Sequence, residues 1–172
     1  MNGGRNSGGN ADKPSLEQRL RAIEDEREIR DLIIRYAQRL DARDHRGYAA
    51  LFAREGRWSG RMGDVTGPEA IEAMLVEEFG PTPEGFVNTR NFHLMSNILI
   101  EVDGDRATAE SRLVYFARTA DAKPGPMLAG RYYDELVRED GKWRFAFRRV
   151  IGEIPTREEK PVRTAEEEGH AP

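Results

Sequence analysis

The chain contains no cysteine among its 172 residues. This absence excludes disulfides, thiolate nucleophiles, cysteine-ligated zinc sites and iron–sulfur clusters. Only three histidines are present, and their spacing matches neither an HExxH motif nor a two-histidine, one-carboxylate site. A phosphate-binding loop ending in GK[ST] and a GxSxG nucleophile elbow are also missing. An enzyme with this inventory is therefore expected to use no cofactor and to work by acid–base chemistry.

Long apolar runs and basic clusters are lacking too. The uninterrupted apolar runs are only a few residues long, and the N-terminal stretch has no hydrophobic core, so neither a membrane span nor a signal peptide is expected. The net charge is −4, and lysine and arginine are not concentrated anywhere, which argues against a nucleic-acid partner. A cytoplasmic location fits the absence of cysteine.

Apolar residues make up only 38% of the chain, and the deficit lies at its two ends. Residues 1–15 contain two apolar side chains and residues 155–172 contain three. Such segments bury too little apolar surface to offset the entropy lost on ordering. We therefore expect one domain over residues 16–154, flanked by disordered tails at 1–15 and 155–172.

Helices are expected in the first half of this domain. Ser15 with Gln18 forms a capping box, and an apolar stripe at helical spacing predicts a helix over 16–42, with a kink near residue 25. A short helix is expected over 48–53 and a further one over 67–79, followed by a loop at 80–85.

Strands are expected in the second half. A short strand is predicted at 58–62, and four long strands at 88–102, 106–119, 127–138 and 142–153, with hairpin signals at Asp103-Gly104-Asp105 and Asp140-Gly141. Leading helices followed by an antiparallel meander indicate an α+β fold with helices on one face of the sheet. Strands this long must twist, so the sheet is expected to curl into a cone that encloses an apolar ligand cavity.

His93 is the strongest candidate for chemistry from the residues alone. It lies inside an expected strand beside Phe92, Leu94 and Met95, whereas His45 and His170 lie in polar surroundings and are expected to be exposed. A histidine at the edge of the core can simply be held by a hydrogen bond, but it can also act as a general base near neutral pH.

Asp41 is the second candidate. It ends the apolar stripe of the first helix, where a carboxylate opposes the helix dipole and needs a partner. An imidazole would supply that partner, and an aspartate that orients a histidine is a recurring catalytic pair. Asp44 fits the same role by spacing and stays an alternative.

Several other side chains are candidates for lining the cavity. Tyr36 lies about one turn before Asp41 and is either core filling or a phenolic donor to a substrate oxygen. Arg149 alternates onto the same strand face as Trp143, Phe145 and Phe147, which predicts an inward direction. The remaining candidates are Trp58, Phe52, Tyr115 and Asn97, the last on the same predicted face as His93.

Five blocks of the chain, in order, resemble the SnoaL-like branch of the nuclear-transport-factor-2-like (NTF2-like, cystatin-like) superfamily: EREIRDLIIRYAQRLDARD, LFAREGRW, TGPEAI, NFHLMSN and GRYYDELVREDGKWRF. The resemblance covers about residues 22–152. It includes scytalone dehydratase, bile-acid 7α-dehydratase and hexachlorocyclohexane dehydrochlorinase, and it implies a cone of helices on a curved sheet.

The resemblance also implies roles for particular residues. Asp41 and His93 match the Asp–His pair of these enzymes, Tyr36 matches a tyrosine of the bile-acid enzyme, and Trp58 matches a pocket tryptophan of the dehydrochlorinase. Arg131 and Arg149 both lie near the position of a catalytic arginine. Scytalone dehydratase uses a second histidine, for which this chain has no counterpart in its expected strands.

Two functions follow as alternatives. The first is a cofactor-free dehydratase, isomerase or polyketide-cyclase-like enzyme acting on an apolar, ring-containing small molecule. The second is a non-catalytic binding or assembly module, like the β subunit of ring-hydroxylating dioxygenases. The mixed outer face of residues 110–116 suggests a subunit contact, so a homodimer or homotrimer is expected.

Overall fold

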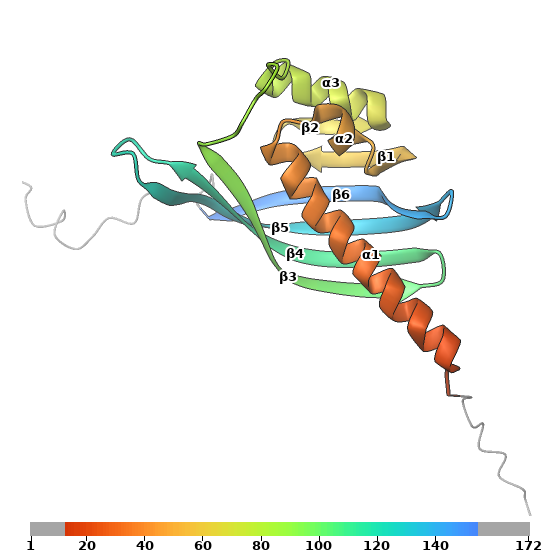
Figure 1. The fold of residues 1–172 in the computed structure, drawn as a ribbon. Coiled ribbons are helices and arrows are strands. Elements are labelled where there is room, and N and C mark those ends of the chain that lie inside the picture. The colour runs from red at the N-terminus through yellow and green to blue at the C-terminus, as the bar shows by residue number, and fades with distance from the viewer. Residues whose placement is uncertain (1–12, 155–172) are drawn as a thin grey trace, which may run out of the picture.

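Residues 13–154 are described by the structure, a computed structural model, while residues 1–12 and 155–172, with nearly all of both expected tails, lie outside the described part. Helices come first and the long strands follow (Figure 1). The helices are α1 (Leu16–Asp41), α2 (His45–Ala49) and α3 (Pro68–Phe79). The strands are β1 (Phe52–Gly60), β2 (Gly63–Thr66), β3 (Asn91–Asp103), β4 (Arg106–Arg118), β5 (Pro124–Glu139) and β6 (Lys142–Ile154).

The long first helix begins where the capping box predicts. The Ser15 side chain accepts a hydrogen bond from the Gln18 backbone at 3.2 Å, and the Gln18 side chain accepts one from the Ser15 backbone at 2.7 Å. The helix runs without a break through residue 25 to Asp41. Its buried stripe packs on the sheet and consists of Asp25, Ile29, Leu32, Ile33, Tyr36 and Ala37.

The second helix lies three residues earlier than expected. Asp44 caps it by accepting a hydrogen bond from the backbone N–H of Gly47 at 2.8 Å, so the helix covers His45–Ala49 rather than 48–53. The chain is already extended at Phe52, where β1 starts. The apolar run at 48–53 therefore divides between a helix and a strand, which periodicity alone does not separate.

One six-stranded sheet has the order β2-β1-β6-β5-β4-β3. The predicted four-stranded antiparallel meander forms β3 to β6, and β1 adds to it in parallel beside β6, with Phe52 opposite Phe145. The sheet curls without closing, and α1 crosses its concave face (Figure 1). The α+β cone expected from the sequence is confirmed.

Two β-bulges change which side chains face the core. In β6, Phe145 pairs with Leu136 and Phe147 pairs with Glu135, so Ala146 is an extra residue. In β3, the register shifts between Ser96 and Leu99. Because side chains alternate along a strand, each extra residue moves all the following side chains to the opposite face.

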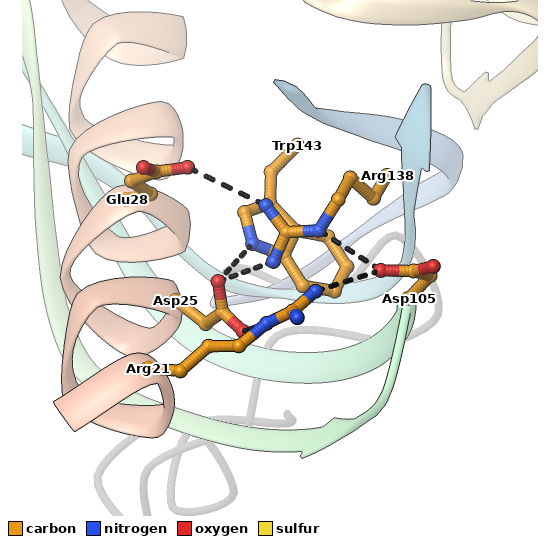
Figure 2. A network of polar contacts seen from close by, with 6 residues as sticks. All are labelled: Arg21, Asp25, Glu28, Asp105, Arg138 and Trp143. Atoms are coloured by element: carbon orange, nitrogen blue, oxygen red, sulfur yellow. Dashed lines mark hydrogen bonds and ion pairs between the residues drawn. The ribbon is translucent and has the colours of Figure 1, made fainter. Parts of the chain in front are cut away.

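A network of charged groups fastens the N-terminal half of α1 to the sheet end where β3 meets β4 and β5 meets β6 (Figure 2). Arg138 forms an ion pair with buried Asp25, contacts Asp105 at 3.0 Å and lies 4.6 Å from the centre of the Trp143 ring. The Trp143 indole donates a hydrogen bond to Asp25 at 3.3 Å. We call these four residues the α1 clasp.

No helix among residues 13–154 is long and apolar enough to cross a membrane.

Candidate active site

Asp41 and His93 meet at one end of the concave face. His93 Nδ1 lies 2.6 Å from Asp41 Oδ1, and the backbone N–H of His93 donates to Asp41 Oδ2 at 3.0 Å. Both oxygens of the carboxylate are therefore used on one residue, which fixes the position of the imidazole ring. The side chains keep 17% and 20% of their surface exposed, so solvent reaches the pair. Asp44, the alternative, instead caps α2 and pairs with Arg39.

The contact sets the tautomer of the His93 ring. A carboxylate only accepts hydrogen bonds, so Nδ1 must carry the proton that lies between the two groups. In the neutral ring, Nε2 is then unprotonated and available as a base. Among residues 13–154, no hydrogen-bond partner occupies Nε2.

Tyr115 lies directly opposite His93 across the β3–β4 pair. The two ring centres are 4.9 Å apart and the rings are tilted by 42°. Burial, together with the negative charge of Asp41, raises the pKa of the Tyr115 phenol above its usual value, although Arg61 opposes this. The hydroxyl therefore stays protonated at neutral pH and can donate a hydrogen bond beside the imidazole.

The loop before β3 ties the end of α1 to the strand that carries His93. The Asn88 amide donates to the Asp41 backbone carbonyl at 2.8 Å and to the Asn91 side chain at 2.9 Å. Its side-chain oxygen accepts from the backbone N–H groups of Arg90 and Asn91 at 3.0 and 3.4 Å. Asn88 is not among the predicted site residues, because the strand expected over 88–102 includes it, whereas β3 begins only at Asn91 and leaves Asn88 in the loop.

Deeper in the cone, the predicted aromatic residues form one buried cluster. The Trp58 indole donates to the Tyr36 hydroxyl at 2.9 Å, and the Tyr36 ring packs 6.4 Å from Phe52 and 4.4 Å from Tyr48. Tyr132 contacts the same ring edge-on at 5.5 Å. Tyr36, Trp58 and Phe52 are thus brought together, on the core side of the Asp41–His93 pair.

Arg148 is the cationic side chain of this cluster, and it is fully buried. Its guanidinium carbon lies 3.8 Å from the centre of Tyr36 and 4.0 Å from that of Tyr132. Its Nε lies 3.1 Å from Asp134 Oδ1, with both side chains fully buried. Burial raises the pKa of the Asp134 carboxyl to about 6, and the Arg148 charge partly offsets this effect.

The ion pair lacks the alignment of a hydrogen bond, and its polar atoms are incompletely satisfied. Within residues 13–154, the guanidinium nitrogens of Arg148, both Asp134 oxygens and the hydroxyls of Tyr48 and Ser111 have no hydrogen-bond partner. Buried polar groups usually have one, provided by protein, water or ligand. The buried cluster therefore holds donors and acceptors that no other described residue satisfies.

Three predicted site residues lie elsewhere. Arg149 is exposed, because the Ala146 bulge turns Arg148 inward in its place. Arg131 lies on the outer face of β5, where it pairs with Glu110 and Glu153. Asn97 is exposed at the β3 bulge with a φ of 49°, so it does not share a face with His93.

His45 also differs from expectation. It is buried rather than exposed, because its ring packs against Phe79 and its Nε2 lies 3.0 Å from the Gly80 carbonyl. That contact joins α2 to the loop after α3.

His170 lies outside the described residues. Within the described part of the chain, no group of three or more His, Asp or Glu side chains is arranged to hold a metal ion.

Comparison with known proteins gives the family. The SnoaL-like domain model matches residues 21–149, which is most of the chain. A search of the curated proteins gives no match. An NTF2-like protein with a cystatin-like fold from Novosphingobium aromaticivorans is 25% identical, with a TM-score of 0.70 over 87% of this chain and 95% of that one.

Two further solved structures carry names of enzymes. A candidate scytalone dehydratase from N. aromaticivorans is 28% identical, with a TM-score of 0.61 over 76% of this chain and 85% of that one. A type 2 hexachlorocyclohexane dehydrochlorinase is 19% identical, with a TM-score of 0.64 over 78% and 88%, and this shows a shared fold only. By its sequence match and its fold, the chain belongs to the SnoaL-like domain family.

Proposed function

We propose that the protein is an acid–base enzyme without a cofactor, a lyase or isomerase that acts on an apolar, ring-containing small molecule. The observation that carries this proposal is the two-point contact between Asp41 and His93, which leaves Nε2 of an accessible imidazole free to take a proton. The similarity to a candidate dehydratase at 28% identity supports it.

The reaction begins with transfer of a proton from a substrate carbon to His93 Nε2. The electron pair of that C–H bond forms a C=C bond as a leaving group departs, or an enolate if the carbon is next to a carbonyl group. Asp41 stabilises the imidazolium that results. The protonated Tyr115 hydroxyl donates to the departing or enolising oxygen on the same side.

The buried cluster holds the far end of the substrate. Among residues 13–154, the guanidinium nitrogens of Arg148 have no hydrogen-bond partner there, and the surrounding aromatic rings favour a flat apolar body. A ring bearing one oxygen substituent satisfies both properties of this surface.

The test is a turnover assay on hydroxylated ring compounds with and without carbonyl groups, read by NMR. We expect His93→Gln and Asp41→Asn to lower kcat, by roughly 100- to 10,000-fold for removal of the base. Asp31→Asn is the matched control, because Asp31 is an exposed aspartate on the same helix. Unchanged turnover in both site variants would refute the dyad.

Exchange of substrate hydrogen separates the two enzyme classes. In D2O, an isomerase returns deuterium to recovered substrate, whereas an irreversible elimination consumes the substrate without labelling it. The same spectra therefore give the class of reaction.

A binding module of the same fold is the second candidate. It is favoured by the closely packed inner end of the cone, where Tyr36, Trp58 and Arg148 are all almost inaccessible to solvent. Under this alternative, a ring compound binds with the same affinity to the wild type and to His93→Gln, and neither turns it over.

A further inference from the structure

Two arginines at one end of the sheet lie side by side with no acidic partner in the described chain. Arg90 precedes β3 and Arg118 ends β4, and the backbone N–H of Arg118 donates to the Arg90 carbonyl at 2.8 Å. Both residues are exposed. Within residues 13–154, no carboxylate oxygen lies within 4.0 Å of either guanidinium, whereas Arg112 and Arg131 on the same face both form ion pairs. Neighbouring like charges favour an anionic partner.

Two phenylalanines extend this cationic pair into a groove. Phe92 and Phe116 are paired across β3 and β4, with ring centres 5.1 Å apart and planes tilted by only 6°. Each lies two residues from one of the arginines, and all four side chains line one groove. The groove has a volume of about 510 Å3 and is also lined by Ala122 and Pro124. We call Arg90, Phe92, Phe116 and Arg118 the outer groove.

Strand β6 ends at the same end of the sheet. Ile154, the final residue of β6, pairs with Ala129, close to the start of β5 (Figure 1). Glu153 points to the outer face, where it forms ion pairs with Arg112 and Arg131. The chain therefore leaves the sheet beside an acid that already reaches across to β4.

The charged side chains on the outer face of β4 differ in whether they have a partner of opposite charge. Glu110 and Arg112 are paired with side chains of β5 and β6, while Arg118 has no acidic partner among residues 13–154. Arg118 lies six residues beyond Arg112 along the strand, a distance of about 20 Å. An acidic segment that continues from Glu153 along this face would reach it.

Residues 155–172 have the composition that the outer groove requires. They hold five glutamates against three basic residues, and three of the glutamates are consecutive, at 166–168. Eleven residues lie between Ile154 and Glu166, and a random-coil chain of that length has a root-mean-square end-to-end distance of about 20 Å. This length is similar to the roughly 20 Å between Arg112, which Glu153 contacts, and Arg118. A linker of matching length gives an effective concentration on the order of 1 mM.

We propose that the acidic C-terminal segment of this chain docks in the outer groove, with its glutamate run at 166–168 on Arg90 and Arg118. The groove also includes Asn88, which holds the end of α1 beside Asp41. Docking therefore covers the outer side of the loop that anchors the Asp41–His93 pair. The inference stands independently of the proposed function.

A spin label tests this docking directly. Since the chain has no cysteine, Ala165→Cys gives one labelling site next to the glutamate run. In the full-length 15N-labelled protein, we expect the amide signals of Phe116, Ala117 and Arg118 to lose most of their intensity relative to the reduced label. The loss should disappear in 1 M salt, where screening acts over about 3 Å.

Matched variants identify the surface. Arg118→Glu and the triple change of Glu166, Glu167 and Glu168 to Gln should each restore the signals. Arg106→Glu, at the opposite exposed end of β4, should not. Signals that stay intact in the labelled parent protein, or that are lost equally in Arg118→Glu, would overturn the proposal. So would an equal loss in a mixture of spin-labelled 14N protein with unlabelled 15N protein, because only a label on a second copy can act there and the occupant would then be that copy.

Discussion

Arg148 is a buried cation whose neighbours are aromatic rings and one buried carboxylate. It is a charge held among three aromatic rings beside a carboxylate that burial disfavours. The pair costs desolvation energy, so it is poor evidence for stability, but breaking it leaves one buried charge uncompensated. A polar ligand group that forms hydrogen bonds with Arg148 or Asp134 would offset part of this desolvation cost.

Replacement of the arginine should therefore depend on its partner. We expect Arg148→Met to lower the free energy of unfolding by on the order of 3 kcal/mol at pH 7, because Asp134 is left buried without its cation. Adding Asp134→Asn should recover much of the loss. Urea unfolding measures both, and Arg149→Met is the control, because Arg149 is exposed and its replacement should change stability by less than about 0.5 kcal/mol.

Asp134 also makes a specific contribution to the pH dependence. Its pKa is raised to about 6 in the folded protein from 3.8, so between these values the folded state binds more protons than the unfolded state. Stability from this group is present below pH 3.8 and is lost as pH rises through 6. The free energy of unfolding of the wild type should fall relative to Asp134→Asn by up to about 3 kcal/mol over that range. A difference that grows with pH would contradict the raised pKa.

Among the elements, the junction of α1 with β3 carries the candidate chemistry. The last residue of a helix and the third residue of a strand are brought together, and one loop asparagine bonds to both elements. The positions of Asp41 and His93 thus depend on backbone contacts as much as on their own hydrogen bond.

Removing that asparagine should loosen the junction. We expect Asn88→Ala to cost about 1–2 kcal/mol of stability, since several hydrogen bonds of a half-buried amide are lost. The His93 ring signals in 1H–15N spectra should shift or broaden, which a purely peripheral change would not cause. Gln38→Ala is the control, because Gln38 is an exposed amide side chain near the same end of α1. Unchanged His93 signals would show that Asp41 is held without Asn88.

The elements also mark the limits of prediction from sequence. Capping signals and apolar periodicity placed α1, α3 and the four long strands within a few residues, and they singled out Asp41 and His93. Alternation failed where β-bulges occur, since the extra residue at Ala146 exchanged Arg149 for Arg148, and the bulge in β3 turned Asn97 outward. Bulges depend on pairing between strands, so a local pattern does not reveal them. The parallel pairing of β1 with β6 was missed for the same reason.

At the scale of the whole molecule, the α1 clasp decides how firmly the long helix lies on the sheet. Arg138→Met should lower stability by roughly 2–3 kcal/mol, because buried Asp25 loses its closer cation and keeps only Arg21, at 3.9 Å. Amide exchange should accelerate over Leu16–Glu28, while the Asp41 end stays protected. Arg19→Met, on an exposed part of the same helix, is the control. Equal acceleration along all of α1 would mean that the helix is released as one unit.

The assembly expected from the sequence, a homodimer or homotrimer, stays a prediction. The outer face exposes Leu94 and Leu99 at 48% and 66%, a degree of apolar exposure that a second copy would cover. Light scattering would give a mass two or three times 19.5 kDa.

The parallel contact between β1 and β6 has a consequence during synthesis. β1 leaves the ribosome more than ninety residues before the strand that must lie beside it, a delay of roughly 5 to 20 seconds at ordinary translation rates. Throughout that interval the edge of β1 that later pairs with β6 has no partner strand, and Phe52 and Trp58 lack the β6 side of their packing. We therefore expect the nascent chain to expose these aromatic side chains until its last strand has been made.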